Sequence, residues 1–328
     1  MRIAVTGSIA TDHLMVFPGR FADQLLPGQL AHLSLSFLVD RLEIRRGGVA
    51  ANVAYGLGGF GLSPLLVGAV GADFAEYEVW LKEHGVDTAA GVRVCPELQT
   101  ARFLCVSDQD ANQIAAFYAG AMARARDIDL APLLTGPEPP GLVLVSPDDP
   151  PAMLRHTAAC RAAGTAFAAD PSQQLARLDG EQARALTRGA TWLFTNEYEA
   201  ALLEERTGRS HEEVLATTGT WITTLGARGV RLERHGQRPL VVPAVTVAAP
   251  ADPTGAGDAF RAGFLAAVSH GAPLQAAARL GNALAATALA AVGSQSYDTD
   301  PAALAALVEQ TYGAAALAPL APVLGGRP

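Results

Sequence analysis

The sequence predicts an α/β fold: a doubly wound, mostly parallel sheet with helices on both faces, accompanied by a small antiparallel β-lid. Two observations lead to this class. Short apolar runs alternate with helix-like apolar patterns along most of the 328 residues, as expected for strand–helix–strand units of a parallel sheet. Residues 14–44 and 100–119 break this alternation, because their patterns are strand-like with no helix between them.

Each expected element follows from the spacing of its apolar residues. Strands are predicted at 3–6, 65–70, 142–146, 165–169, 192–195 and 221–225. Helices are predicted around 49–57, 73–84, 150–163, 197–206, 259–269 and 274–291.

The same patterns predict the domain organisation. Residues 1–13, 45–99 and 120–313 are expected to form the large α/β domain, which would carry the main ligand-binding and catalytic groups. Residues 14–44 and 100–119 form the lid, with strands expected at 14–17, 32–44, 100–106 and 113–119. The lid is expected to cover the carboxyl edge of the large sheet, where α/β folds bind ligands. The Ala- and Pro-rich tail 314–328 is expected to be loosely ordered.

Composition excludes several classes of protein. The net charge of −8 and the isoelectric point near 5.4 argue against nucleic acid or an anionic membrane as a partner. The three cysteines are widely spaced without a C-x-x-C pair, as expected for reduced thiols in a reducing compartment. There is no apolar run of about 18 residues that would suggest a membrane span. We therefore expect a soluble, cytoplasmic enzyme that acts on small molecules.

The shortage of lysine argues against the classes of active site that require a lysine. Lys82 is the only lysine in the sequence, and its surroundings suggest a surface helix. A Walker A lysine, the strand lysine of a protein kinase and a pyridoxal-phosphate Schiff base are therefore improbable. A phosphate bound by this chain would be held by backbone N–H groups, a metal ion and arginine.

The stretch 252–260, Asp-Pro-Thr-Gly-Ala-Gly-Asp-Ala-Phe, is the most informative motif. Its glycines run directly into an apolar helix pattern, which places unpaired backbone N–H groups at a helix start where the helix dipole favours an anion. Asp258 lies in the first helical turn beside this anion hole, where a carboxylate is useful as a base for a hydroxyl that attacks phosphorus. The alternative is an ordinary acidic residue in the first turn of a helix.

A second glycine-rich block lies about 200 residues earlier, at 46–52. Gly47 and Gly48 allow the backbone to approach a ligand closely at the start of a helix, and Asn52 follows one turn later. Taken alone, this block favours a simple Gly-rich strand-to-helix turn over a ligand site.

Together the two blocks resemble the two signature regions of the ribokinase (PfkB) family of sugar and nucleoside kinases, and the resemblance covers nearly the whole chain. It implies transfer of the γ-phosphoryl group of ATP to a primary hydroxyl. Asp258 would be the base, and the N–H groups of Gly255, Ala256 and Gly257 would form the anion hole.

The resemblance also implies an ATP side and metal sites. The stretch 196–199 resembles the N-x-x-E motif of the family, in which Glu199 would act on Mg²⁺ through water. Without the family, the same residues are simply a helix N-cap followed by first-turn acids. Asp252 and the turn at 293–294 resemble the ligands of a K⁺ site. The ATP-binding residues implied are Asn196, Thr224, Gly226, Gly229 and Thr254.

Substrate choice is suggested by a few side chains. Asp12 is expected at the sheet edge, where its carboxylate can accept two ribose hydroxyls, although a lone Asp is more often a turn former. Phe103 and Phe117 on the lid are suited to sandwich a purine, or else to pack the lid on the core. The substrate-binding set resembles that of the actinobacterial adenosine kinases within this family: Ser8, Asp12, Ser36, Gly47, Gly48, Asn52, Phe103, Phe117, Gln173 and Arg177.

The sequence therefore predicts an adenosine kinase that uses ATP with Mg²⁺, and K⁺ as an activator. A ribokinase-like or fructokinase-like sugar kinase is the alternative, because both signatures are shared. A non-catalytic nucleoside or sugar sensor is the alternative from another class, although binding alone does not require Asp258. The exposed strand edges of the lid suggest a homodimer built through the lids.

Overall fold

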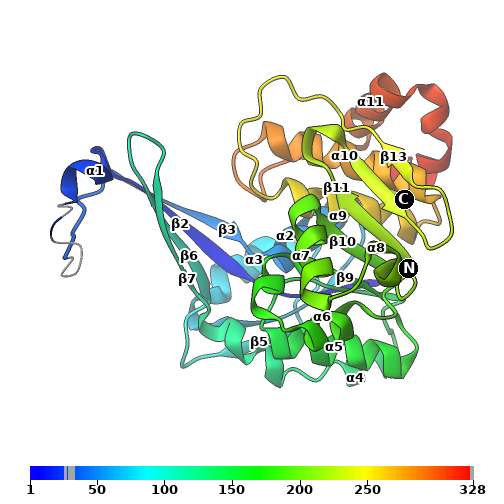
Figure 1. Cartoon of the computed structure of the whole chain (residues 1–328), viewed down its shortest axis with the longest axis horizontal. Coiled ribbons are helices and arrows are strands. Elements are labelled where there is room, and N and C mark those ends of the chain that lie inside the picture. Colours follow the sequence, from blue (N-terminus) through cyan, green and yellow to red (C-terminus); the bar gives the residue numbers. More distant parts are fainter. Residues whose placement is uncertain (26–27, 29–33, 326–328) are drawn as a thin grey trace.

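A large sheet forms the centre of the molecule in the computed structural model, which describes residues 1–25, 28 and 34–325 (Figure 1). Within these residues the sheet has nine strands in the order β13-β12-β11-β10-β9-β8-β1-β4-β5. All of its pairings are parallel except β11–β12 and β12–β13. The strands are β1 (Ile3–Thr6), β4 (Leu65–Gly71), β5 (Val92–Cys95), β8 (Leu142–Val145), β9 (Ala166–Ala169), β10 (Trp192–Asn196), β11 (Thr220–Thr224), β12 (Val230–Glu233) and β13 (Leu240–Val242).

Helices cover both faces of this sheet, as the alternation of patterns predicts (Figure 1). They are α2 (Val49–Gly59), α3 (Ala75–Glu83), α4 (Ala131–Thr135), α5 (Pro150–Ala163), α6 (Gly180–Thr187), α7 (Glu197–Thr207), α8 (His211–Leu215), α9 (Ala256–Ser269), α10 (Leu274–Ala290), α11 (Pro301–Tyr312) and α12 (Ala321–Leu324). The short helix α1 (Phe21–Gln24) lies apart from them, at the far end of the lid (Figure 1). None of the helices in the described ranges is long and apolar enough to cross a membrane.

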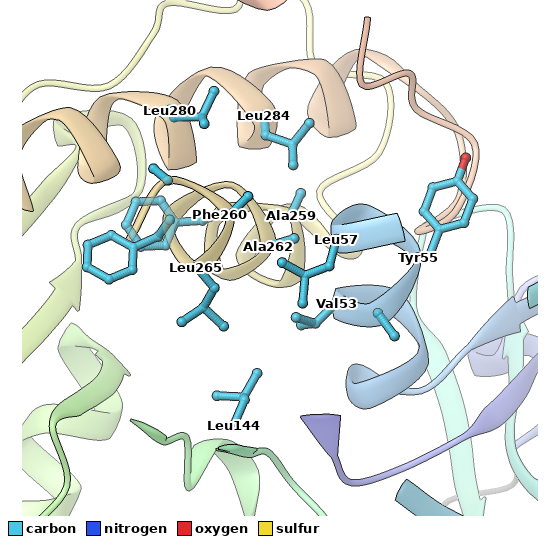
Figure 2. Close-up of a cluster of buried hydrophobic side chains, with 14 of the residues drawn as sticks. Val53, Tyr55, Leu57, Leu144, Ala259, Phe260, Ala262, Leu265, Leu280 and Leu284 are labelled. Atoms are coloured by element: carbon cyan, nitrogen blue, oxygen red, sulfur yellow. The ribbon is translucent and has the colours of Figure 1, made fainter. Parts of the chain in front are cut away.

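The central strands are apolar throughout because both of their faces are buried. Successive side chains of β1 enter different cores: Ile3 and Val5 join the cluster under α2, α9 and α10, whereas Ala4 joins the cluster under α5, α6 and α7. Figure 2 shows the first of these clusters, where Leu57 of α2 lies beside α9. Helix α9, which begins at the predicted anion hole, is therefore fixed between α2 and α10 by apolar packing.

The predicted lid is a separate sheet of four strands in the described part of the chain, β3-β2-β6-β7, which projects from the large domain (Figure 1). Its strands are β2 (Ala10–Val16), β3 (Arg41–Gly47), β6 (Ala101–Ser107) and β7 (Gln113–Tyr118). The outer pairings β2–β3 and β6–β7 are antiparallel, and the central pairing β2–β6 is parallel.

Three differences from the expected boundaries have simple physical causes. The lid sheet begins at Ala10, so Asp12 belongs to the lid, because β2 continues the chain of β1 after a short break at 7–9. Of the strand expected at 32–44, residues 32 and 33 lie outside the described residues, 34–40 are not part of a strand, and β3 begins only at Arg41.

The tail is the third difference. Its composition predicts loose order, yet residues 314–325 form short helical turns against α10 and α11. Ala316, Leu320 and Val323 are buried in the core shared with α9 and α10. Three apolar residues at helical spacing bury enough surface to fix a segment that composition alone does not identify as ordered.

Candidate active site

The N-terminus of α9 has the geometry of an anion hole. Gly255 caps the helix with φ of 79°, and a Cβ atom at this position would lie 2.6 Å from Cβ of Ser294, so only glycine fits. Within the described residues, the N–H groups of Gly255 and Gly257 have no hydrogen-bond acceptor, and that of Ala256 makes only a long contact of 3.3 Å to the Pro253 carbonyl. These donors are therefore available to an anion.

Asp258 lies in the first turn of α9, where Asn52 of α2 holds its carboxylate. The Asn52 Nδ2 group donates to Asp258 Oδ2 at 2.8 Å. The amide oxygen of Asn52 accepts from Ser294 Oγ at 3.0 Å and from Gln295 Nε2 at 2.9 Å. Because both ends of the amide are used, Asn52 fixes the position of Asp258.

Burial raises the pKa of Asp258, and the charge of Arg261 and the Asn52 hydrogen bond oppose this rise. A higher pKa makes the carboxylate a better proton acceptor for a substrate hydroxyl. The position of Asp258 in the first turn of α9 and its raised pKa are compatible with the predicted role of a base.

Two cavities meet at the start of α9. The first, of about 590 Å³, lies between the lid and the carboxyl ends of the central strands, and Asp258, Gly255 and Thr254 line it. The second, of about 490 Å³, lies between β11, the 244–253 segment and α10, and Ala256 and Gly257 line it. A hydroxyl in the first cavity and a phosphate from the second would meet at the anion hole beside Asp258.

The first cavity gathers most of the predicted substrate-binding residues. Those that line it are Ser8, Asp12, Gly48, Asn52, Phe103, Phe117, Gln173 and Arg177. They come from the segment after β1, the lid strands β2, β6 and β7, the start of α2 and the segment after β9, because parallel strands end at one edge of the sheet.

Asp12 faces this cavity from the lid strand β2, next to Gly47. A Cβ at Gly47 would lie 2.9 Å from Asp12 Oδ2, so the glycine leaves room for the carboxylate. Burial raises the pKa of Asp12 to about 6, the charge of Arg45 opposes the rise, and the nearby Asp258 and Asp252 add to it. Gly47 itself does not line the cavity, and its carbonyl accepts from the Tyr77 hydroxyl.

Gly48 and Ser8 shape the floor of the cavity. Gly48 has φ of 93°, and a Cβ there would lie 2.6 Å from the Ser8 carbonyl oxygen, so the chain passes too closely for any other residue. The Ser8 hydroxyl accepts from the Val49 N–H at 3.0 Å, which satisfies a free donor at the start of α2.

Phe103 and Phe117 both line the cavity, but they do not face each other. They occupy directly opposed positions on the neighbouring antiparallel strands β6 and β7, so their side chains lie next to one another on one face of the lid. The predicted sandwich is therefore replaced by a shared aromatic wall, because the sheet register brings both rings from the same side.

The opposite wall carries polar groups that can meet a base. Gln173, Gln174 and Arg177 belong to a 3-10 turn, 172–177, that follows β9. Gln174 is not in the predicted substrate-binding set, but it is buried, and its Oε1 atom has no hydrogen-bond partner in the described part of the chain. A buried amide without a partner is costly unless a ligand completes it.

The second cavity suits a nucleotide. Thr224, Gly226 and Gly229 of the predicted ATP-side turn line it, together with apolar residues such as Val245 and Leu289. Thr254, which was expected on the ATP side, lines the first cavity instead, because the tight turn at Gly255 separates it from Ala256.

Asn196 and Glu199 form a capping box at the start of α7, so the helix-cap interpretation describes their hydrogen bonds. Glu199 N donates to Asn196 Oδ1 and Asn196 N donates to Glu199 Oε2, both at 2.8 Å. Neither residue lines the two cavities. The second carboxylate oxygen of Glu199 meets only the Ser172 hydroxyl, at 3.2 Å.

This arrangement fits Mg²⁺ held through water and phosphate. Among the described residues there is no cluster of three acidic, His or Cys side chains that could cage a metal. Mg²⁺ in phosphoryl-transfer sites is usually bound by substrate phosphates, water and one or two carboxylates. Glu199 is the carboxylate that would contribute, through water, and the ion would screen the phosphate charge.

Asp252 does not fit a K⁺ site in this arrangement. Its Oδ1 atom accepts from the Thr254 N–H at 2.9 Å, and its Oδ2 atom accepts from Arg45 Nη1 at 2.9 Å and from the Gly293 N–H at 3.0 Å. The carboxylate is thus already paired with a cation.

One further prediction and one omission complete the site. Ser36 lies in an exposed segment outside both cavities. Arg261 was missed: its guanidinium is buried on α9 and pairs with buried Asp170 through Nε–Oδ2 and Nη2–Oδ1 contacts of 2.6 and 2.7 Å. An arginine within the apolar pattern of 259–267 was the sequence signal for a buried charge.

Comparison with known proteins agrees with this geometry. The chain is 30% identical over 263 residues to a nucleoside kinase of Methanothermobacter thermautotrophicus, covering 79% of this chain and 83% of the relative. The structure of Burkholderia thailandensis nucleoside kinase with inosine has a TM-score of 0.82, 33% identity, and coverage of 95% and 98% of the two chains.

A second structure of the Burkholderia enzyme, with ADP-inosine, has a TM-score of 0.80 and 35% identity over 95% of this chain and 96% of that one. The family model "pfkB family carbohydrate kinase" matches residues 8–301, which include both glycine-rich blocks, the lid and the two cavities. The chain therefore belongs to the PfkB family of carbohydrate kinases.

Proposed function

We propose that this protein is a nucleoside kinase that transfers the γ-phosphoryl group of ATP to the 5′-hydroxyl of a purine nucleoside, with adenosine as the substrate. The single observation that carries the proposal is the first cavity, whose lining brings together Asp12, the aromatic wall and Asp258. These groups are suited to the ribose hydroxyls, the base and the reacting hydroxyl of a nucleoside. The kinship with nucleoside kinases supports the same class.

The base contacts favour a purine without distinguishing among purines. The wall formed by Phe103 and Phe117 offers an apolar surface for stacking, and Gln174 offers an amide with an unused oxygen. An amide can turn to match either adenine or hypoxanthine, because it carries both a donor and an acceptor. Adenosine and inosine therefore need to be measured side by side.

The decisive experiment is a screen of the purified protein with ATP, Mg²⁺ and a panel of nucleosides and sugars, read by ADP release. Adenosine is expected to give the highest kcat/KM. A preference for ribose or fructose would establish the sugar-kinase alternative, whereas tight nucleoside binding without ADP release would establish the sensor alternative.

Asp258→Asn tests the proposed base. The amide cannot accept the hydroxyl proton, so turnover should fall by about 10² to 10⁴. Adenosine binding, measured by calorimetry, should stay within a few-fold of the unmodified protein, because the neighbouring contacts remain. Near-normal kcat in the variant would refute the assigned role.

Phe103→Ala and Phe117→Ala test the aromatic wall. Each change should weaken adenosine binding by about 1–3 kcal/mol, or roughly 5- to 150-fold in Kd, through lost stacking. The matched control is Tyr118→Ala, because Tyr118 follows Phe117 in β7 and points to the other face of the lid. Thermal melts identify any variant that misfolds. Unchanged adenosine affinity in folded Phe variants, with Asp12→Ala still impaired, would favour a sugar substrate.

The raised pKa of Asp12 leads us to expect that nucleoside binding depends on pH. The ionised carboxylate accepts ribose hydroxyls, and its pKa of about 6 means that protonation removes part of this capacity below that pH. Adenosine affinity should therefore fall as the pH drops through about 6. Calorimetry between pH 5 and 8 measures it, and Asp12→Asn should bind weakly with little pH dependence. If the adenosine affinity of Asp12→Asn fell by the same factor over this pH range, the titrating group would be a residue other than Asp12.

We also propose a homodimer through the lids. The lid face turned away from the cavity carries Leu42, Ile44, Ile114 and Tyr118, which are 44–60% exposed. A sheet with one apolar face in water is normally covered by a second sheet. A second copy would cover this face while leaving the cavity face free.

Light scattering tests the dimer, with an expected mass of about twice 33.9 kDa. Ile44→Asp should yield monomers, because it places a charge on the apolar lid face. Val241→Asp is the control, since Val241 is comparably exposed on β13 at the far end of the large sheet. A monomer for the unmodified protein at working concentration would rule out the dimer.

A further inference from the structure

Arg45 links the lid to the anion hole through a continuous set of contacts. It lies on β3, and its Nη1 atom donates to Asp252 Oδ2 at 2.9 Å. Asp252 in turn accepts from the N–H groups of Thr254, which precedes Gly255, and of Gly293, which precedes Ser294 in the segment that packs against Gly255. The arginine is thus part of the structure that shapes the anion hole.

The contacts continue from this turn to the base. Ser294, next to Gly293, packs against the Gly255 turn and places its hydroxyl 3.0 Å from Asn52 Oδ1. Asn52 holds Asp258. A cation at Asp252 therefore stabilises both the anion hole and the position of the base.

Arg45 is well placed to supply this cation permanently. The side chains of Arg45 and Asp252 are only 21% and 13% exposed, and Glu43 Oε1 accepts from Arg45 Nε at 2.6 Å and orients the guanidinium. Because both oxygens of Asp252 accept from N–H groups and one of them meets the guanidinium, a metal cation would have to displace the guanidinium or sit beside a like charge.

We infer that the guanidinium of Arg45 takes the place of a monovalent cation at Asp252, so that the anion hole of this protein is complete without K⁺. The charge comes from the lid, where Arg45 is the register partner of Asp12 on β2. One strand pair therefore carries both the contact proposed for the nucleoside and the cation of the anion hole. The inference rests on the proposed kinase function only for its kinetic test.

The kinetic test compares K⁺, Na⁺ and tetramethylammonium chlorides at equal ionic strength. The unmodified protein should give rates within about twofold in all three salts, because its cation is covalently attached. In tetramethylammonium chloride, the reaction rate of Arg45→Ala should be about tenfold lower than that of the unmodified protein. K⁺ should raise the rate of this variant several-fold, because it can occupy the vacated place at Asp252. Arg45→Lys should keep activity without K⁺.

The matched control is Arg41→Ala. Arg41 lies on the same strand and the same lid face and also pairs with Glu43, but it is exposed and does not contact Asp252. Its rates should equal those of the unmodified protein in each salt. If Arg45→Ala does not fold, Arg45→Gln keeps most of the side-chain volume and replaces it in the comparison.

Thermal melts give a readout that does not depend on turnover. K⁺ should raise the Tm of Arg45→Ala relative to tetramethylammonium and leave the Tm of the unmodified protein unchanged. If no substrate is phosphorylated, the proposed function fails, while the melts still decide whether Arg45 substitutes for the cation.

Three results would overturn the inference. The first is strong activation of the unmodified protein by K⁺ over Na⁺ and tetramethylammonium. The second is an Arg45→Ala variant that is fully active with no response to any cation. The third is a rise in the KM for ATP without a cation response, which would show that Arg45 contacts phosphate instead.

Discussion

The hydrogen bond between Asn52 and Asp258 is the contact on which the site depends. It joins the first turns of α2 and α9, which come from the two glycine-rich blocks, and it fixes the base at 2.8 Å from a fully used amide. The apolar packing of α9 between α2 and α10 holds the two turns in place. The anion hole at Gly255–Gly257 is then aligned with both cavities without a flexible side chain.

The negative charges of the carboxylates near this hydrogen bond explain why arginine side chains lie close to it. Asp12, Asp252 and Asp258 lie close enough for the latter two carboxylates to raise the pKa of the first. With one lysine in the sequence, arginine has to compensate: Arg45 from the lid and Arg261 from α9, where it pairs with Asp170. Planar guanidinium groups suit this task, because each can meet two acceptors at once while partly buried.

The lid connects substrate binding with phosphoryl transfer. Its inner face carries Asp12, Arg45 and the two phenylalanines, and its outer face carries exposed apolar residues. Strand alternation separates the two faces, so a substrate and a second copy can use the same small sheet without competing. Removal of water by such a lid strengthens the electrostatic contacts beside the base.

The sequence by itself determined the fold class, the family and the elements of the large sheet, because these depend on local apolar periodicity and on turns where only glycine fits. It also placed Asp258 and the anion hole, since both lie within nine consecutive residues. Contacts between distant segments were decided by the tertiary structure. The register of β6 and β7 set the Phe103 and Phe117 side chains next to one another on one face of the lid, and Thr254 lines the cavity under the lid rather than the second cavity.

The order of the tail, the ion pair of Arg45 and the buried amide of Gln174 also depend on contacts between segments that are far apart in the sequence. Burial of Leu320 needs a surface made by α10 and α11, the pairing of Arg45 with Asp252 joins residues 207 positions apart, and the unpaired amide of Gln174 is apparent only once its surroundings are known. Local sequence fixes what a segment can form. Which charge meets which carboxylate depends on packing that brings remote segments together.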